Sequence, residues 1–153
     1  MYQLTPIAVV HGGRSDPTDD HWGSVRSTIE LVPELPVESL AGLEAFSHLE
    51  VVFLFHKVDE ASIVTSARHP RERRDWPRVG IFGQRGKARP NRLGVSRCRL
   101  LSVEGRSVRV EGLDAIAGTP VLDLKPYLRE FGPVGEVRQP EWATELMRHY
   151  YDP

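Results

Sequence analysis

The sequence predicts an all-β fold, a barrel or a sandwich of short strands, and three observations support this class. About six short runs rich in β-branched and aromatic residues are separated by turns that contain Gly or Pro. Only residues 39–47 and 141–151 show the apolar spacing of a helix, and both segments are short. No GxGxxG motif follows a strand and opens a helix, which argues against a doubly wound nucleotide-binding sheet.

Six strands are expected, and two features among them are well marked. The expected strands are residues 7–10, 25–32, 49–58, 95–103, 108–110 and 121–124. Residues 49–58 are the most hydrophobic segment and predict a central strand buried on both faces, with His56 and Lys57 at its end. The turn Glu104-Gly105-Arg106 between two alternating runs predicts a β-hairpin.

Length and composition indicate one ordinary globular domain over residues 1–153. Hydrophobic residues make up 40% and charged residues 27%, which argues against disorder. No apolar run is long enough for a membrane helix, and the first ten residues lack a basic n-region and a cleavage signal, so a cytoplasmic location is expected. Cys98 is the only cysteine and is expected to be buried in a strand.

Positive charge is concentrated in residues 68–92, which we call the basic window. It holds eight arginines and one lysine against two acids, a net charge of +7, whereas the rest of the chain holds 11 bases and 19 acids. Arginine forks suit phosphates and carboxylates, and Trp76 and Phe82 offer flat surfaces for a base, so an anionic ligand is expected. Composition supports an alternative equally well, namely that these arginines pair with surface acids.

The remaining chemistry-bearing residues give weaker signals. No histidine pair has the spacing of a zinc site, and His69 with the acids of residues 16–21 is the nearest approach, so no metal is expected. No GxSxG motif is present, which argues against a covalent hydrolase. Asp114 and Asp123 are candidates for acid–base work, although Asp114 also has the sequence context of a turn residue.

Three blocks of the sequence resemble those of the TsaA-like family, which includes the TrmO-type tRNA methyltransferases. The blocks are FSHLEVVFLFHK (46–57), GIFGQRGKARPNRLGVS (80–96) and VEGLDAIAGTPVLDLKPY (110–127). The likeness covers about residues 5–130, and it implies that these residues form the core of the domain, with a C-terminal tail or helix at 131–153. The family's early Pro-Arg-Gln-type cofactor contact has no counterpart in the loop of residues 12–25.

The resemblance implies a small, mostly antiparallel β-barrel with short peripheral helices. It also implies a homodimer that binds S-adenosyl-L-methionine near the subunit interface. The implied reaction is N6-methylation of threonylcarbamoyl-adenosine beside the tRNA anticodon. Two alternatives stay open: a cofactor- or nucleotide-binding module without transfer activity, and a methyltransferase that acts on a small molecule or a protein.

The resemblance and the residue types together name a candidate site. By motif, the cofactor-binding residues are His56, Lys57, Arg85, Arg89, Pro90, Asn91, Val95, Ser96, Leu113, Asp114, Ala115, Ile116 and Thr119. The general base is left open among Asp114, Asp123 and His56. Residues expected to contact RNA phosphates are Arg71, Arg73, Arg74 and Arg78. The tail aromatics Trp142, Tyr150 and Tyr151 are expected to pack onto the barrel in preference to forming an interface.

Overall fold

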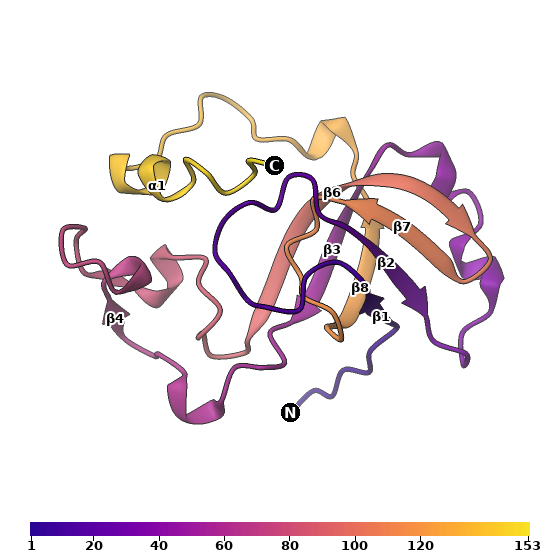
Figure 1. Ribbon diagram of the computed structural model, residues 1–153, viewed down its shortest axis with the longest axis horizontal. Coiled ribbons are helices and arrows are strands. Elements are labelled where there is room, and N and C mark those ends of the chain that lie inside the picture. Colours follow the sequence, from indigo (N-terminus) through magenta and orange to yellow (C-terminus); the bar gives the residue numbers. More distant parts are fainter.

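A computed structural model describes all residues 1–153 and shows a closed six-stranded antiparallel barrel (Figure 1). The barrel strands are β1 (Ala8–His11), β2 (Arg26–Leu31), β3 (His48–Leu54), β6 (Leu93–Glu104), β7 (Ser107–Glu111) and β8 (Pro120–Pro126). Their order around the barrel is β1-β2-β7-β6-β3-β8, and β8 closes the ring by pairing with β1. The predicted barrel is confirmed.

The elements outside the barrel are short. They are the ribbon of β4 (Ala67–Arg68) and β5 (Val79–Gly80), the helix α1 (Glu141–Leu146), and the 3-10 turns η1 (Val37–Leu40), η2 (Leu43–Ala45), η3 (Glu60–Ser62), η4 (Pro70–Glu72), η5 (Ile81–Gly83) and η6 (Arg129–Phe131). None of these helices has the length and apolar character that crossing a membrane requires. The helix expected at 39–47 is wrong in kind: two 3-10 turns flank Gly42, whose φ of +85° interrupts a helix.

Strand β3 was expected to span residues 49–58 and to be buried on both faces, and the structure differs on both points. Leu49, Val51 and Phe53 are buried, but the residues between them are half-exposed. Inward and outward positions alternate because the interior of a small barrel is filled from one face of each strand. The strand also ends at Leu54, so His56 lies in the turn that follows it.

The predicted hairpin is confirmed as β6 and β7, joined by a turn in which Gly105 has a φ of +59°. Cys98 is 3% exposed and belongs to the core, as its place in an alternating run predicts. The core side chains that line the barrel interior include Val10, Ile29, Val51, Val108, Val110 and Val121. In Figure 1 the basic window and the C-terminal tail extend together on one side of this barrel, next to the loop that follows β1.

Candidate functional site

The first half of β6 has a neighbouring strand on only one side. Strand β3 pairs with β6 over Leu93–Arg99, whereas the pairing of β7 with β6 begins only at Arg99. The opposite side of β6 before Arg99 is therefore an open strand edge. Arg85 occupies part of it, because its Nη2 donates to the carbonyl oxygen of Val95 at 2.8 Å. Such an edge offers backbone donors and acceptors to a ligand.

Asp114, Ser96 and Tyr150 meet beside this edge, and we call them the Asp114 cluster. Ser96 comes from β6, Asp114 from the connector between β7 and β8, and Tyr150 from the C-terminal tail. The Ser96 hydroxyl donates to Oδ1 of Asp114 and the Tyr150 hydroxyl donates to Oδ2. A carboxylate can accept about four hydrogen bonds, so half-buried Asp114 keeps acceptor capacity for a ligand.

The hydroxyl and thiol beside Asp114 stay neutral at neutral pH. Burial, together with the charge of Asp114, raises the pKa of Tyr150 well above its ordinary value, so its phenol remains a donor. Burial and, secondarily, Asp114 raise the pKa of Cys98 to about 12, so this thiol is not a nucleophile at neutral pH. The cluster therefore offers hydrogen-bonding groups and no covalent nucleophile.

His56 lies at the far end of the same connector. A Cβ at Gly118 would lie 3.6 Å from His56 Nε2. Partial burial, followed by the charge of Lys57, lowers the pKa of His56, whereas a hydrogen bond with the Leu54 backbone opposes this. His56 is therefore neutral at neutral pH and able to accept a proton. Lys57 beside it is exposed.

The predicted connector residues divide into one polar group and an apolar support. Leu113, Ala115 and Ile116 are buried. Thr119 is 2% exposed, and its hydroxyl donates to the Ile116 carbonyl at 2.6 Å. Asp114 is thus the one predicted connector residue that presents an ionisable group to the site.

Arg89 at the centre of the motif holds its own loop. Its Nη1 donates to the carbonyl oxygens of Gln84 at 2.7 Å and Gly86 at 3.3 Å. Pro90 and Asn91 are exposed in the turn that follows. The structure therefore gives Arg89 a role in shaping the loop that carries Arg85, and ligand contacts by these three motif residues stay a prediction.

Asp123 lies on the other side of the barrel wall from Asp114. It pairs with Val52 across β8 and β3, so the two side chains share the outward face, whereas the buried Ser96 faces inward. Its carboxylate is about half-exposed and lies 3.0 Å from Lys125 Nζ. The structure does not bring the two candidate carboxylates together.

The expectation that arginines of the basic window pair with acids is met for part of the window. Arg71 pairs with Asp20 at 3.1 Å, and Arg73 pairs with Asp75 while its guanidinium lies 4.1 Å from the ring centre of Trp76. Exposed Arg74, in contrast, has no ion-pair partner in the structure. The window therefore combines arginines already neutralised with arginines free for an anion.

Two further arginines of the window have no acidic partner. Arg78 makes a single contact, from Nη2 to the Ala67 carbonyl at 3.2 Å. Arg68 has a buried Nε without any hydrogen-bond partner. A Cβ at Gly86 would lie only 3.0 Å from Arg68 Nη2, so the absence of a side chain at Gly86 lets the Arg68 guanidinium pack against it. Arg68 is therefore held in the loop without an acidic partner.

The tail docks on the loop after β1 and on the basic window rather than on the barrel strands (Figure 1). The backbone N–H of His21 donates to His149 at 3.0 Å, and that of Trp22 donates to Tyr150 at 2.8 Å. Sequence reasoning treated Tyr150 only as a packing aromatic and missed its bond to Asp114. No local signal identifies a contact between residues 36 positions apart.

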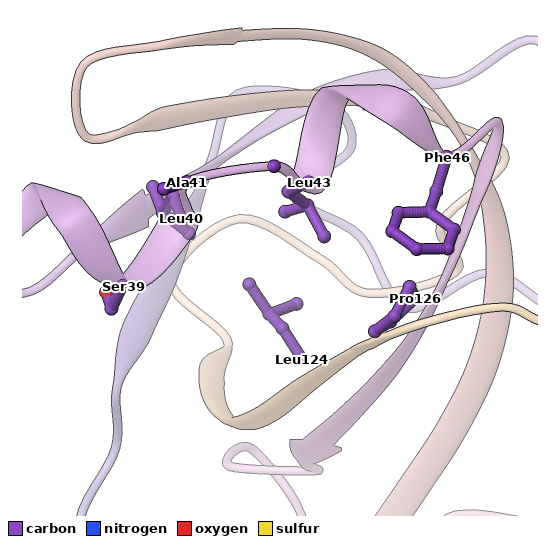
Figure 2. Close-up of a pocket in the computed structure, with 8 residues that line it drawn as sticks. Ser39, Leu40, Ala41, Leu43, Phe46, Leu124 and Pro126 are labelled. Atoms are coloured by element: carbon purple, nitrogen blue, oxygen red, sulfur yellow. The ribbon is translucent and has the colours of Figure 1, made fainter.

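No group of three or more His, Cys, Asp or Glu side chains is placed to hold a metal ion. A separate groove of about 350 Å³ lies between η1, η2 and β8. Figure 2 shows its mostly apolar lining, which includes Leu40, Leu43, Phe46, Leu124 and Pro126. None of the predicted site residues lines this groove.

A closed antiparallel barrel with a carboxylate held at an open strand edge, beside an arginine-rich loop, defines a ligand-binding barrel domain. Its ligand is expected to carry hydrogen-bond donors and an anionic group. The chain belongs to the family of the tRNA-methyltransferase O N-terminal domain, whose model matches residues 17–132.

Two relatives and one solved structure illustrate this membership. A tRNA (adenine(37)-N6)-methyltransferase from Homo sapiens is 37% identical over 118 residues, which is 77% of this chain and 26% of that protein. A probable S-adenosyl-L-methionine-binding protein from Methanothermobacter thermautotrophicus is 35% identical over 137 residues, covering 87% of this chain and 95% of that protein. The crystal structure of TrmO from Pseudomonas aeruginosa is 30% identical with a TM-score of 0.72, covering 90% of this chain and 61% of that chain. The chain thus spans about a quarter of the human relative's length.

Proposed function

We propose that this chain binds S-adenosyl-L-methionine at the Asp114 cluster and the open edge of β6, and methylates N6 of an adenosine next to the tRNA anticodon. The proposed acceptor is threonylcarbamoyl-adenosine. The observation that carries the proposal is the half-buried Asp114 carboxylate, held by two hydroxyls beside the open edge of β6 where Arg85 binds Val95. The family membership and the names of the relatives support the cofactor and the reaction.

The residues present fit the chemical groups of this cofactor. The open edge of β6 offers backbone partners for an adenine, and Asp114 can accept from a ribose hydroxyl or an ammonium group. Arg85 and Lys57 are exposed and can supply positive charge for a carboxylate. When bound, the cofactor supplies an electrophilic methyl group on a sulfonium.

The protein's contribution is to position the acceptor and take up a proton. Holding reacting groups in a near-attack geometry supplies much of the rate of such a transfer, and no covalent protein intermediate is needed. The adenosine N6 loses a proton as it gains the methyl group, and neutral His56 or the Asp114 carboxylate can accept it. Asp123 does not share this site, because it lies on the outer face of the barrel.

The free arginines of the basic window are proposed to contact tRNA phosphates. We expect Arg74→Ala to weaken tRNA binding a few-fold and to reduce the slope of log affinity against log salt by about one, because one phosphate contact is lost. Arg109→Ala is the matched control, since Arg109 is also exposed but lies on β7 outside the window. Filter binding at several salt concentrations measures both variants. Equal slopes for wild type, Arg74→Ala and Arg109→Ala would contradict this assignment.

We also propose that the chain acts as a homodimer in the cytoplasm, where a tRNA substrate is available. Supporting this, apolar side chains remain exposed along residues 128–137, with Phe131 74%, Val134 99% and Val137 64% exposed. Sedimentation equilibrium is expected to give twice the monomer mass of 17.3 kDa. A monomer at micromolar concentration would count against the dimer.

A transfer assay tests the proposed reaction. The protein is incubated with methyl-labelled cofactor and total tRNA, and the digested nucleosides are identified by mass spectrometry. We expect label in N6-methylated threonylcarbamoyl-adenosine, and none in an unmodified transcript of the same tRNA. Cofactor binding without turnover would indicate a binding module, and label in proteins or small molecules would indicate another acceptor. Either result would contradict the proposal.

A further inference from the structure

We propose that Tyr150 is a positioning residue that fixes the Asp114 carboxylate for the ligand, so that the tail of residues 141–153 forms one wall of the site. The inference rests on the proposed function. It concerns a part of the chain beyond residues 17–132, the segment that the family model matches.

Two hydroxyls from separate elements are needed to fix the plane of this carboxylate. Ser96 on β6 holds only Oδ1 of Asp114. A carboxylate held at one oxygen can still turn about its Cβ–Cγ bond. The Tyr150 hydroxyl holds Oδ2 and removes that freedom. Donors to a charged acceptor form hydrogen bonds about twice as strong as neutral ones, so the restraint is firm.

The position of the Tyr150 hydroxyl is set by the loop after β1. The Tyr150 carbonyl accepts from Trp22 at 2.8 Å and the His149 carbonyl accepts from His21 at 3.0 Å. The Tyr150 ring also packs edge-on against Tyr151, with ring centres 5.0 Å apart. Tyr150 is therefore held on both its backbone and its ring.

A second attachment joins the tail to the basic window. Trp76 is buried, and its Nε1 donates to Glu145 Oε2 at 2.9 Å. The Trp76 and Trp142 rings pack with their centres 6.5 Å apart. The tail therefore bridges the proposed RNA-binding segment and the Asp114 cluster, which is the placement expected of a wall that belongs to the site.

The chemistry of Tyr150 suits positioning rather than proton transfer. Burial and the adjacent Asp114 charge raise its pKa, so the phenol keeps its proton over the neutral range. It therefore donates continuously to Asp114, which retains lone pairs for the ligand.

Calorimetric titration with S-adenosyl-L-methionine tests the inference on the full chain. We expect Tyr150→Phe to weaken binding about tenfold, because one hydrogen bond to a charged group is lost. Tyr127→Phe is the matched control: Tyr127 follows β8 outside the tail, its hydroxyl makes no hydrogen bond in the structure, and we expect affinity within about twofold of wild type. Thermal unfolding of both variants identifies any loss of folding.

Repeating the Tyr150→Phe substitution in an Asp114→Asn variant distinguishes a positioning role of Tyr150 from a structural one. In Asp114→Asn the acceptor is neutral, so we expect Tyr150→Phe to cost no more than about twofold there. An equal tenfold loss in both backgrounds would show that Tyr150 does not act through Asp114 and would overturn the inference. Tyr150→Phe binding as tightly as wild type would overturn it too, and would leave the proposed function standing. Failure of the wild-type chain to bind the cofactor would overturn the proposed function and the inference together.

Discussion

Asp114→Ala is expected to reduce methyl transfer to tRNA by about a hundredfold, because a misplaced or lost reacting group costs about that much. The substitution removes the carboxylate that is proposed to accept hydrogen bonds from the ligand. It also leaves the hydroxyls of Ser96 and Tyr150 without their partner, at a cost of about 1–3 kcal/mol for each buried donor left unsatisfied. Single-turnover rates and kcat/KM measure the loss.

Asp123→Ala is the informative comparison, because the sequence presents both aspartates as candidate bases. Asp123 is on the outer face beside Lys125, so we expect this variant to retain nearly the wild-type rate. The opposite ranking, with Asp123→Ala inactive and Asp114→Ala active, would place the reaction on the other side of the barrel wall and contradict the site described above.

Gly23→Ala is expected to displace the C-terminal tail from its contact with the loop after β1. A Cβ at Gly23 would lie 2.8 Å from the carbonyl carbon of Tyr151 and closer still to its oxygen, so the tail backbone has to move. Overpacking of this kind costs about 1–3 kcal/mol. We expect amide hydrogens of residues 141–151 to exchange faster and cofactor affinity to fall, as is also expected for Tyr150→Phe.

Ser24→Ala is the matched control for the tail experiment. Ser24 is the next residue along the chain and is exposed, so its hydroxyl is not part of the tail contact. We expect its tail exchange and its affinity to match wild type. If amide exchange in residues 141–151 is unchanged in Gly23→Ala, the loop moves in place of the tail. The position of the tail would then not depend on Gly23.

The strands were predictable because their signals are local. The burial of Cys98 in β6 was expected from its place in a strand, and the turn at Gly105 predicted the hairpin. The burial of β3 on both faces was not correct, because a run of apolar residues does not show that a closed barrel has only one inner face. The helix at 39–47 failed at Gly42, whose left-handed conformation divides the segment.

Only the site residues that lie within the motif blocks could be predicted from the sequence. Motif resemblance named Arg85, Val95, Ser96 and Asp114, and the structure brings these into one region. It did not identify Tyr150, because the Asp114 contact depends on how the tail folds back over the loop after β1. Long-range docking of this kind depends on steric fit at Gly23 and leaves no periodic pattern in the sequence.

The ion pairs of the arginines likewise include long-range contacts that the sequence does not reveal. Arg73 and Asp75 are two residues apart, whereas Arg71 and Asp20 are separated by 51 positions. Composition shows that the basic window carries excess charge, but only the fold shows that Arg71 is neutralised while Arg74 is free. The division between ion-paired and unpaired arginines follows from tertiary contacts.

A crystal structure of the chain with S-adenosylhomocysteine tests the central claim most directly. We expect the adenosyl group to lie along the open edge of β6, with a hydroxyl or amine of the ligand bonded to Asp114 and the tail still docked through Tyr150. A ligand bound elsewhere, such as in the apolar groove between η2 and β8, with Asp114 contacting only Ser96 and Tyr150, would contradict the account.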